Sequence, residues 1–220
     1  MRRICLVGFG GNFKWANDMP DDVEIWGLNE VHKNIIRWDR WFQIHPRNWH
    51  AESAAEKGWR TDEWGRAPGH ELFLNSCGVP VYMRDVDPAI PTSVRYPFEA
   101  VTEAFGRDFT ERGKRPYLTS TPAYMIALAL LEGVDELLLS GINLAIDTEY
   151  WHQRPCFEYY LGIAKGRGVK ITFPPFGCPL LDGPVYAVEE APPMLDLQLH
   201  LVPAYDGAEN GQLVGVVQNA

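Results

Sequence analysis

Residues 4–12 read Ile4-Cys5-Leu6-Val7-Gly8-Phe9-Gly10-Gly11-Asn12, a short apolar run that ends in three glycines and an amide. The run predicts a buried β-strand. The glycines predict a loop that a ligand can approach closely, because glycine has no Cβ and adopts positive φ. Backbone N–H groups in such a loop, with the start of a following helix, form an anion site. The stretch indicates a phosphate or nucleotide ligand. Its three glycines are not spaced as in the G-x-G-x-x-G dinucleotide fingerprint, whose last glycine is missing here, and it has no P-loop lysine. A glycine turn after a first strand also occurs in α/β proteins that bind nothing there.

Strand and helix patterns alternate along the chain. Apolar runs predict strands at residues 4–7, 23–27, 40–44, 79–83, 136–140 and 169–173. Helical spacing of apolar residues predicts helices at 97–105, 121–132 and 155–165. The alternation predicts an α/β fold, a Rossmann-like and mostly parallel sheet with helices on both faces.

Two regions depart from this alternation. Residues 47–70 are rich in Trp, Glu and Gly and predict a lid or an insertion. We therefore expect one Rossmann-like nucleotide-binding domain over residues 1–182 and an irregular C-terminal extension over 183–220. The extension holds two short apolar runs, which fit a hairpin, an arm that joins copies in a homo-oligomer, or a disordered tail.

Composition limits the classes of partner. The 220 residues carry a net charge of -9, which argues against a broad basic face for duplex nucleic acid. The four cysteines form no CxxC pair, so we expect reduced, buried thiols. No apolar run approaches the length of a membrane span and no signal-peptide core is present, so we expect a cytoplasmic protein with no membrane partner.

Ligands of parallel α/β sheets lie beyond the carboxyl ends of the strands. Polar or glycine residues follow several predicted strands here, and a Thr-Ser-Thr-Pro turn precedes the apolar helix at 121–132. That turn predicts either a helix cap or a phosphate contact. The candidate nucleotide-binding residues are Gly8, Phe9, Gly10, Gly11, Asn12, Asn29, His45, Thr119, Ser120, Thr121, Gly141 and Asn143.

The densest group of reactive side chains lies at 147–155, between a strand and a helix. His152 is a candidate general base, because the pKa of an ordinary histidine lies near neutrality. Glu149 or Asp147 could orient it, and Arg154 could meet a phosphate. A solvated loop with a helix cap explains the same residues. No HExxH or HxH spacing indicates a metal site.

The segments 118–125 and 137–143 resemble the bacterial sialyltransferases that use CMP-sialic acid. Gly8-Phe9-Gly10-Gly11-Asn12 is similar to the glycine loop of that family, Asn29 falls where it has a nucleotide-contacting Asn, and His152 falls near its catalytic His. Tyr150 is a candidate for a phosphate-contacting Tyr. The same frame resembles archaeal-type 6-hydroxymethylpterin pyrophosphokinases, and residues 149–159 look like uncharacterised phage-encoded proteins. In a phage the expected location is the host cytoplasm.

Three functions remain open from the sequence. The first is a nucleotide-dependent, sialyltransferase-like glycosyltransferase, in which His152 acts on an unidentified acceptor and no cofactor is required. The second is pyrophosphoryl transfer from ATP, which needs Mg²⁺, with Asp147 and Glu149 as the nearest ligands. The third is a phage protein that binds a nucleotide without turnover.

Overall fold

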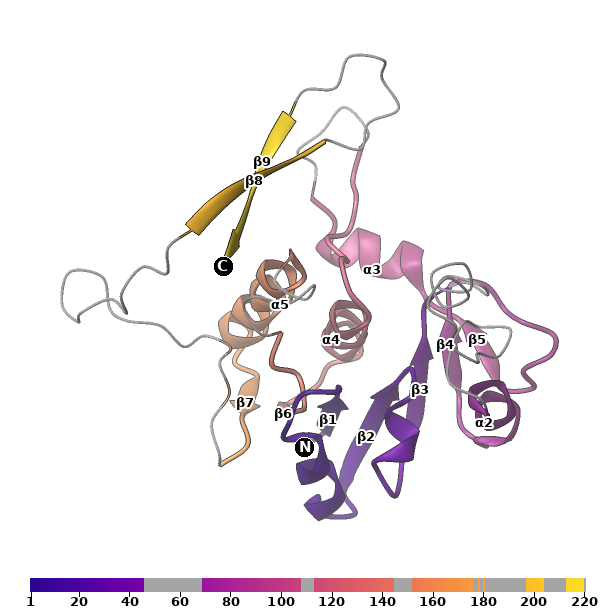
Figure 1. The fold of residues 1–220 in the computed structure, drawn as a ribbon. Helices are drawn as coiled ribbons and strands as arrows, with labels where there is room; N and C mark the ends of the chain where they lie inside the picture. Colours follow the sequence, from indigo (N-terminus) through magenta and orange to yellow (C-terminus); the bar gives the residue numbers. More distant parts are fainter. Residues whose placement is uncertain are drawn as a thin grey trace.

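The computed structural model describes residues 1–45, 69–107, 113–144, 152–175, 178 and 180, and the backbone of two further strands. The element order is β1 (Arg3–Val7), η1 (Phe13–Asp18), β2 (Val23–Leu28), η2 (Val31–Lys33), β3 (Arg40–Gln43), α2 (His70–Ser76), β4 (Val81–Met83), β5 (Ser93–Arg95), α3 (Phe98–Phe105), α4 (Thr121–Leu131), β6 (Glu136–Ser140), α5 (Arg154–Gly166), β7 (Lys170–Thr172), β8 (Leu197–Pro203) and β9 (Leu213–Asn219). Figure 1 shows these elements along the chain. The alternating α/β order predicted from the sequence is confirmed.

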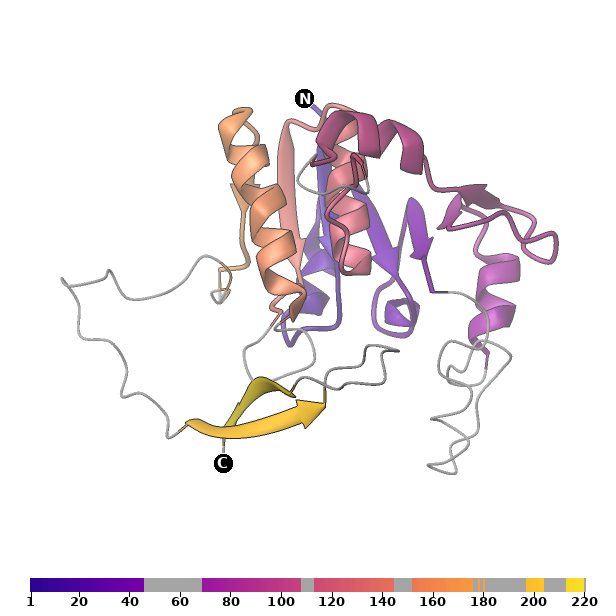
Figure 2. The same cartoon turned by 90° about the horizontal axis from the view of Figure 1, so that it is seen from above.

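The described strands β1 to β7 form one sheet in the order β5-β4-β3-β2-β1-β6-β7. Every neighbouring pair in it is parallel. In Figure 2 the indigo and purple strands point away from the N-terminus and toward the lower edge, so this edge holds their carboxyl ends. Strands β8 and β9 pair separately and antiparallel, from the two apolar runs of the C-terminal extension.

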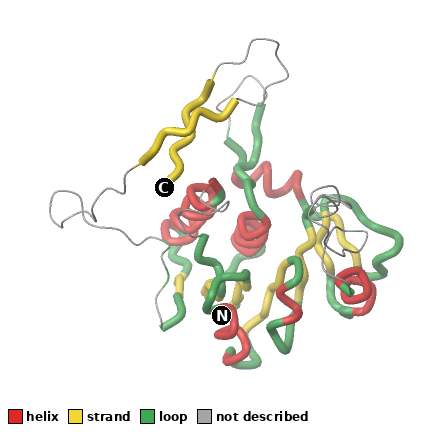
Figure 3. The backbone as a smooth tube through the Cα atoms, in the orientation of Figure 1, coloured by secondary structure: helices red, strands yellow, loops and turns green. Residues whose placement is uncertain are grey.

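Apolar layers cover both faces of the sheet, as Figure 3 shows by helices on both sides of the strands. Alternate strand residues divide between two cores, with Ile4 and Leu6 in one and Cys5 and Val7 in the other. The first core is completed by α3, α4 and α5, whereas η1, η2 and α2 complete the second. Helices on both faces are therefore confirmed.

Helix α4 shows why the sequence folds this way locally. Its residues are apolar nearly all round, and it packs against α3, α5 and three strands of the sheet. Ser120 is its N-cap and Pro122 lies in its first turn. Gly133 follows its end at φ +78°, a left-handed conformation that glycine adopts without strain.

Four elements were not predicted. They are η1, η2, the seven-residue helix α2 and the three-residue strand β5. The expected lid at 47–70 lies outside the described residues except for its last two positions, and His70 begins α2. Of the four free cysteines, Cys5 and Cys156 are buried as expected, but Cys77 and Cys178 are only partly buried.

Candidate functional site

The chain leaves neighbouring strands β1 and β6 toward opposite faces of the sheet. After β1 it enters η1, whose Ala16 packs in the second core. After β6 it leads to α5, whose Phe157 packs in the first core. Such a switch point is where α/β sheets bind ligands, just beyond the carboxyl ends of the strands. The glycine loop after β1 and Gly141 after β6 meet there.

Backbone hydrogen bonds tie the two loops together. The Gly8 N–H donates to Ser140 O at 2.8 Å, and the Gly10 N–H donates to Gly141 O at 2.6 Å. The Gly141 N–H donates to Asn12 Oδ1 at 2.9 Å. Two of the glycine N–H groups expected to hold an anion are therefore used within the protein. In the described part of the chain, the N–H groups of Phe9 and Gly11 donate to no acceptor.

The space available for a side chain differs among the three glycines of the loop. A Cβ on Gly8 would lie 2.6 Å from Gly141 O, and a Cβ on Gly10 would lie 2.7 Å from Asn143 Nδ2. Nothing lies within 4 Å of a Cβ on Gly11. Gly8 and Gly10 are thus required for loop packing, whereas Gly11 leaves backbone open to a ligand.

Two amide oxygens that follow strands β2 and β6 are buried and accept no hydrogen bond within the described structure: Asn29 Oδ1 and Asn143 Oδ1. Asn143 packs against Gly10. Asn29 follows β2 at φ +47°, a conformation that asparagine tolerates better than most residues. Buried polar atoms usually have partners, so the two oxygens are unfilled acceptors at the carboxyl edge of the sheet.

The N-terminus of α4 lies at the same edge, because α4 leads into a parallel strand and packs over β1, β2 and β3. Ser120 Oγ accepts a hydrogen bond from the Ala123 N–H at 3.3 Å, so the capping interpretation holds for Ser120. Thr121 is buried and Thr119 is exposed.

Helix α5 also begins at this edge, since it joins β6 to the parallel strand β7. His152 is exposed two residues before the helix. Arg154 Nε donates to Glu158 Oε1 at 2.7 Å, so part of the guanidinium expected to meet a phosphate is paired with a carboxylate on the next helical turn. Asp147, Glu149 and Tyr150 lie outside the described residues.

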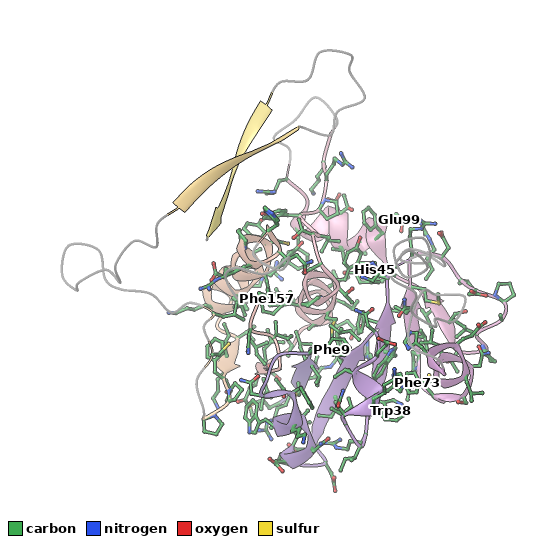
Figure 4. The ribbon with its side chains drawn as sticks, viewed as in Figure 1. Phe9, Trp38, His45, Phe73, Glu99 and Phe157 are labelled. Carbon is green, nitrogen blue, oxygen red and sulfur yellow. The ribbon has the colours of Figure 1, made fainter. Side chains whose placement is uncertain are left out.

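Figure 4 labels two further candidates, Phe9 beyond β1 and His45 beyond β3. Phe9 is 45% exposed and His45 is partly exposed. Phe9 is a large, partly exposed apolar side chain in the glycine loop, and an aromatic ring of this kind can stack on a base or a sugar.

Sequence analysis missed the polar cluster on the η2 side of the edge. There His70 Nε2 and Gln43 Oε1 are 3.0 Å apart, and the His32 ring lies 5.5 Å from the His70 ring. Gln43 ends an apolar strand, and a single amide there carries no motif that could have identified it.

Neither a metal cluster nor a membrane span is found in the part of the chain that the structure describes. No three His, Cys, Asp or Glu side chains there are placed to share a metal ion. No described helix has the length and apolarity needed to cross a bilayer.

No protein-family model matches the chain, and no curated protein matches it in sequence. Among solved structures, it is similar to the sialyltransferase CstII from Campylobacter jejuni in complex with the substrate analogue CMP-3FNeuAc. That likeness has 14% identity and a TM-score of 0.46, and covers 79% of this chain and 81% of the other. A CST-II complex with a trisaccharide acceptor and CMP gives 13% identity and a TM-score of 0.45, over 78% and 80% of the two chains. At these identities and TM-scores the likeness says nothing about the reaction.

Proposed function

We propose that this chain is a nucleotide-dependent transferase, a glycosyltransferase of the sialyltransferase-like kind with His152 as general base. The observation that carries the proposal is the β1–β6 switch point. There the glycine loop has an open backbone at Gly11 and packs against Asn143 at Gly10, and Asn29 follows the neighbouring strand β2. The buried amide oxygens of both asparagines lack hydrogen-bond donors in the described structure. A nucleotide supplies what this edge lacks, namely a phosphate for free N–H groups and polar hydrogens for the oxygens.

In the proposed reaction the nucleotide lies over the glycine loop, with Asn29 and the turn at 119–121 beside it. His152 takes the proton from an acceptor hydroxyl as that oxygen bonds to the anomeric carbon of the donor sugar. The bond from that carbon to the nucleotide phosphate breaks, and the phosphate leaves with the bonding electrons. Backbone N–H groups, Tyr150 or Arg154 stabilise the charge on the leaving phosphate, and Glu149 orients His152.

Nucleotide binding is tested first, by thermal shift with a panel of nucleotides and nucleotide sugars, with and without Mg²⁺. A ligand specific to the folded state raises the melting temperature by mass action. The variant Gly11→Leu fills the open space and should weaken binding tenfold or more, which is about 1.4 kcal/mol. Gly162→Leu is the matched control, because Gly162 is exposed within α5 and also has nothing within 4 Å. Unchanged affinity in a folded Gly11→Leu protein would remove the glycine loop from the site.

Catalysis is tested with His152→Ala. Loss of a general base should lower the rate by roughly 10²–10⁴-fold while nucleotide affinity stays near the wild-type value. His45→Ala is the comparison variant. Full turnover by His152→Ala would move the base to another residue, and loss of binding as well would make His152 a ligand contact. Turnover of ATP that requires Mg²⁺ would favour pyrophosphoryl transfer, and binding without turnover of any donor would leave a nucleotide-binding protein.

A further inference from the structure

Three buried polar atoms near the ends of β2 and β3 have no hydrogen-bond partner within the described structure. They are Asn29 Oδ1, His32 Nδ1 and Gln43 Nε2. Gln43 is 1% exposed, so water does not satisfy its amide from the surface. An unmet buried donor or acceptor costs about 1–3 kcal/mol, and such atoms are uncommon in native proteins.

Hydrogen bonds and ring contacts join these atoms into one cluster. The Asn29 N–H donates to Phe42 O at 3.1 Å, which places Asn29 beside the end of β3. Trp41 Nε1 donates to Asn29 O at 3.1 Å, and the His32 ring lies 5.9 Å from the Trp41 ring. Asn29 and Gln43 each come one residue after the registered pair Leu28 and Phe42, so they are neighbours across the two strands.

A contact from α2 orients the Gln43 amide. The 3.0 Å contact between His70 Nε2 and Gln43 Oε1 is a hydrogen bond when His70 donates from Nε2. The amide nitrogen of Gln43 is then the end turned away from His70. This assignment follows from the hydrogen-bond network, as it does for any side-chain amide.

The amide side chains of Asn29 and Gln43 carry no charge, and the surroundings of His32 favour its neutral form. Burial lowers the pKa of His32, and the positive charge of Lys33 lowers it further, while the Asn29 backbone and Glu30 oppose this only in part. The neutral ring stacks on Phe73 at 3.9 Å with planes 7° apart. Figure 4 labels Phe73 and Trp38 on this side of the sheet, and their rings are 5.2 Å apart. Aromatic neighbours and neutral amide groups favour an uncharged polar group over a phosphate.

We propose that Gln43 and Asn29 are specificity-determining residues that take the uncharged hydrogen-bonding part of the ligand. Gln43 Nε2 donates to an acceptor on that group, and Asn29 Oδ1 accepts from a donor beside it. Both a nucleobase edge and the hydroxyls of a sugar have this chemistry. The inference rests on the proposed function, because it divides one ligand between a phosphate at Gly11 and a neutral group at Gln43.

The experiment compares wild-type protein with Gln43→Glu, Gln43→Met and Phe73→Leu by calorimetric titration. Gln43→Glu keeps an oxygen toward His70 and turns the free donor into an acceptor. Gln43→Met removes both the amide oxygen and the amide nitrogen. It is a second variant in case the buried carboxylate of Gln43→Glu disturbs folding. Phe73→Leu is the matched control, since it alters packing on His32 and removes no polar group. The first set of probes, CMP, UMP, AMP and GMP, compares nucleobases. The second set compares a nucleotide with its nucleotide sugar, UDP with UDP-glucose and CMP with CMP-sialic acid.

Both Gln43 variants should bind the preferred probe tenfold or more weakly and keep the affinity for the poorest one. If the group is a nucleobase, the differences among the four monophosphates shrink. If the group is a sugar, the variants lose part of the extra affinity that a nucleotide sugar has over its nucleotide. Folded Gln43 variants that bind every probe like wild type would overturn this inference alone, as would an equal loss in Phe73→Leu. A wild-type protein that binds none of the probes would overturn the proposed function and this inference with it.

Discussion

Asn12 Oδ1 accepts a hydrogen bond from the Gly141 N–H at 2.9 Å, across 129 positions of sequence. The bond links the two sides of the switch point, because it joins the loop after β1 to the loop after β6. Ser140 reinforces it, since its buried Oγ lies 2.9 Å from Phe13 O and accepts from the Ala16 N–H at 3.1 Å. The base of the candidate site is thus a set of bonds between two distant segments.

Asn12→Ala should destabilise the protein by about 1–3 kcal/mol, because it leaves the Gly141 N–H without its acceptor. Urea unfolding measures the change. Lys14→Ala is the control, since Lys14 is exposed and lies two residues further on. Equal stability of the two variants would mean that the bond to Gly141 does not hold the loops together.

Gly10→Ala should destabilise the protein and Gly11→Ala should not. A Cβ on Gly10 would lie 2.7 Å from Asn143 Nδ2, whereas a Cβ on Gly11 meets nothing within 4 Å. Overpacking of this kind typically costs about 1–3 kcal/mol. Melting temperatures of both variants test the difference. Adding Asn143→Ala to Gly10→Ala should recover part of the loss, and strict additivity would show that the two positions do not meet.

Asn29→Gly should be more stable than Asn29→Ala by about 1 kcal/mol, because φ at this position is +47° and an alanine is strained there. Both variants remove the same amide, so their difference isolates the backbone conformation. Chemical unfolding of the pair measures it. Equal stabilities of Asn29→Gly and Asn29→Ala would mean that position 29 does not have a positive φ in solution.

Acid should weaken the protein through Glu136. Burial raises the pKa of this carboxylate, but hydrogen bonds from Lys170, Thr172 and Arg3 outweigh burial and bring the pKa from 4.5 to about 2. Because the folded pKa is the lower one, the stabilisation is full above about pH 4.5 and is lost as the pH falls toward 2.

Glu136→Gln should therefore flatten the decline in stability between pH 4.5 and 2, by roughly 1–3 kcal/mol. The free energy of unfolding as a function of pH measures this. Glu99→Gln, in an exposed pair with Arg95, should change the profile far less. Parallel profiles for wild type and Glu136→Gln would contradict the assignment.

The sequence alone determined the elements whose signal is local. Apolar runs located β1, β2, β3 and β6, and helical spacing located α3, α4 and α5 to within one or two residues. Ser120 and Pro122 marked the start of α4 for the same reason, since a cap and its helix are neighbours in the chain. The short elements β5 and α2 carried too few residues for a period to be recognised.

Tertiary structure decided what those elements do at the carboxyl edge. Asn12 Oδ1 accepts from Gly141, and Gly10 donates to the same residue, while the contact between Asn12 and a nucleotide stays a prediction. Gln43 meets His70 only because β3 and α2 pack together. Local periodicity depends on neighbouring residues, and the sequence records it directly. Which donors and acceptors are left unpaired depends on segments that meet only after the sheet has formed.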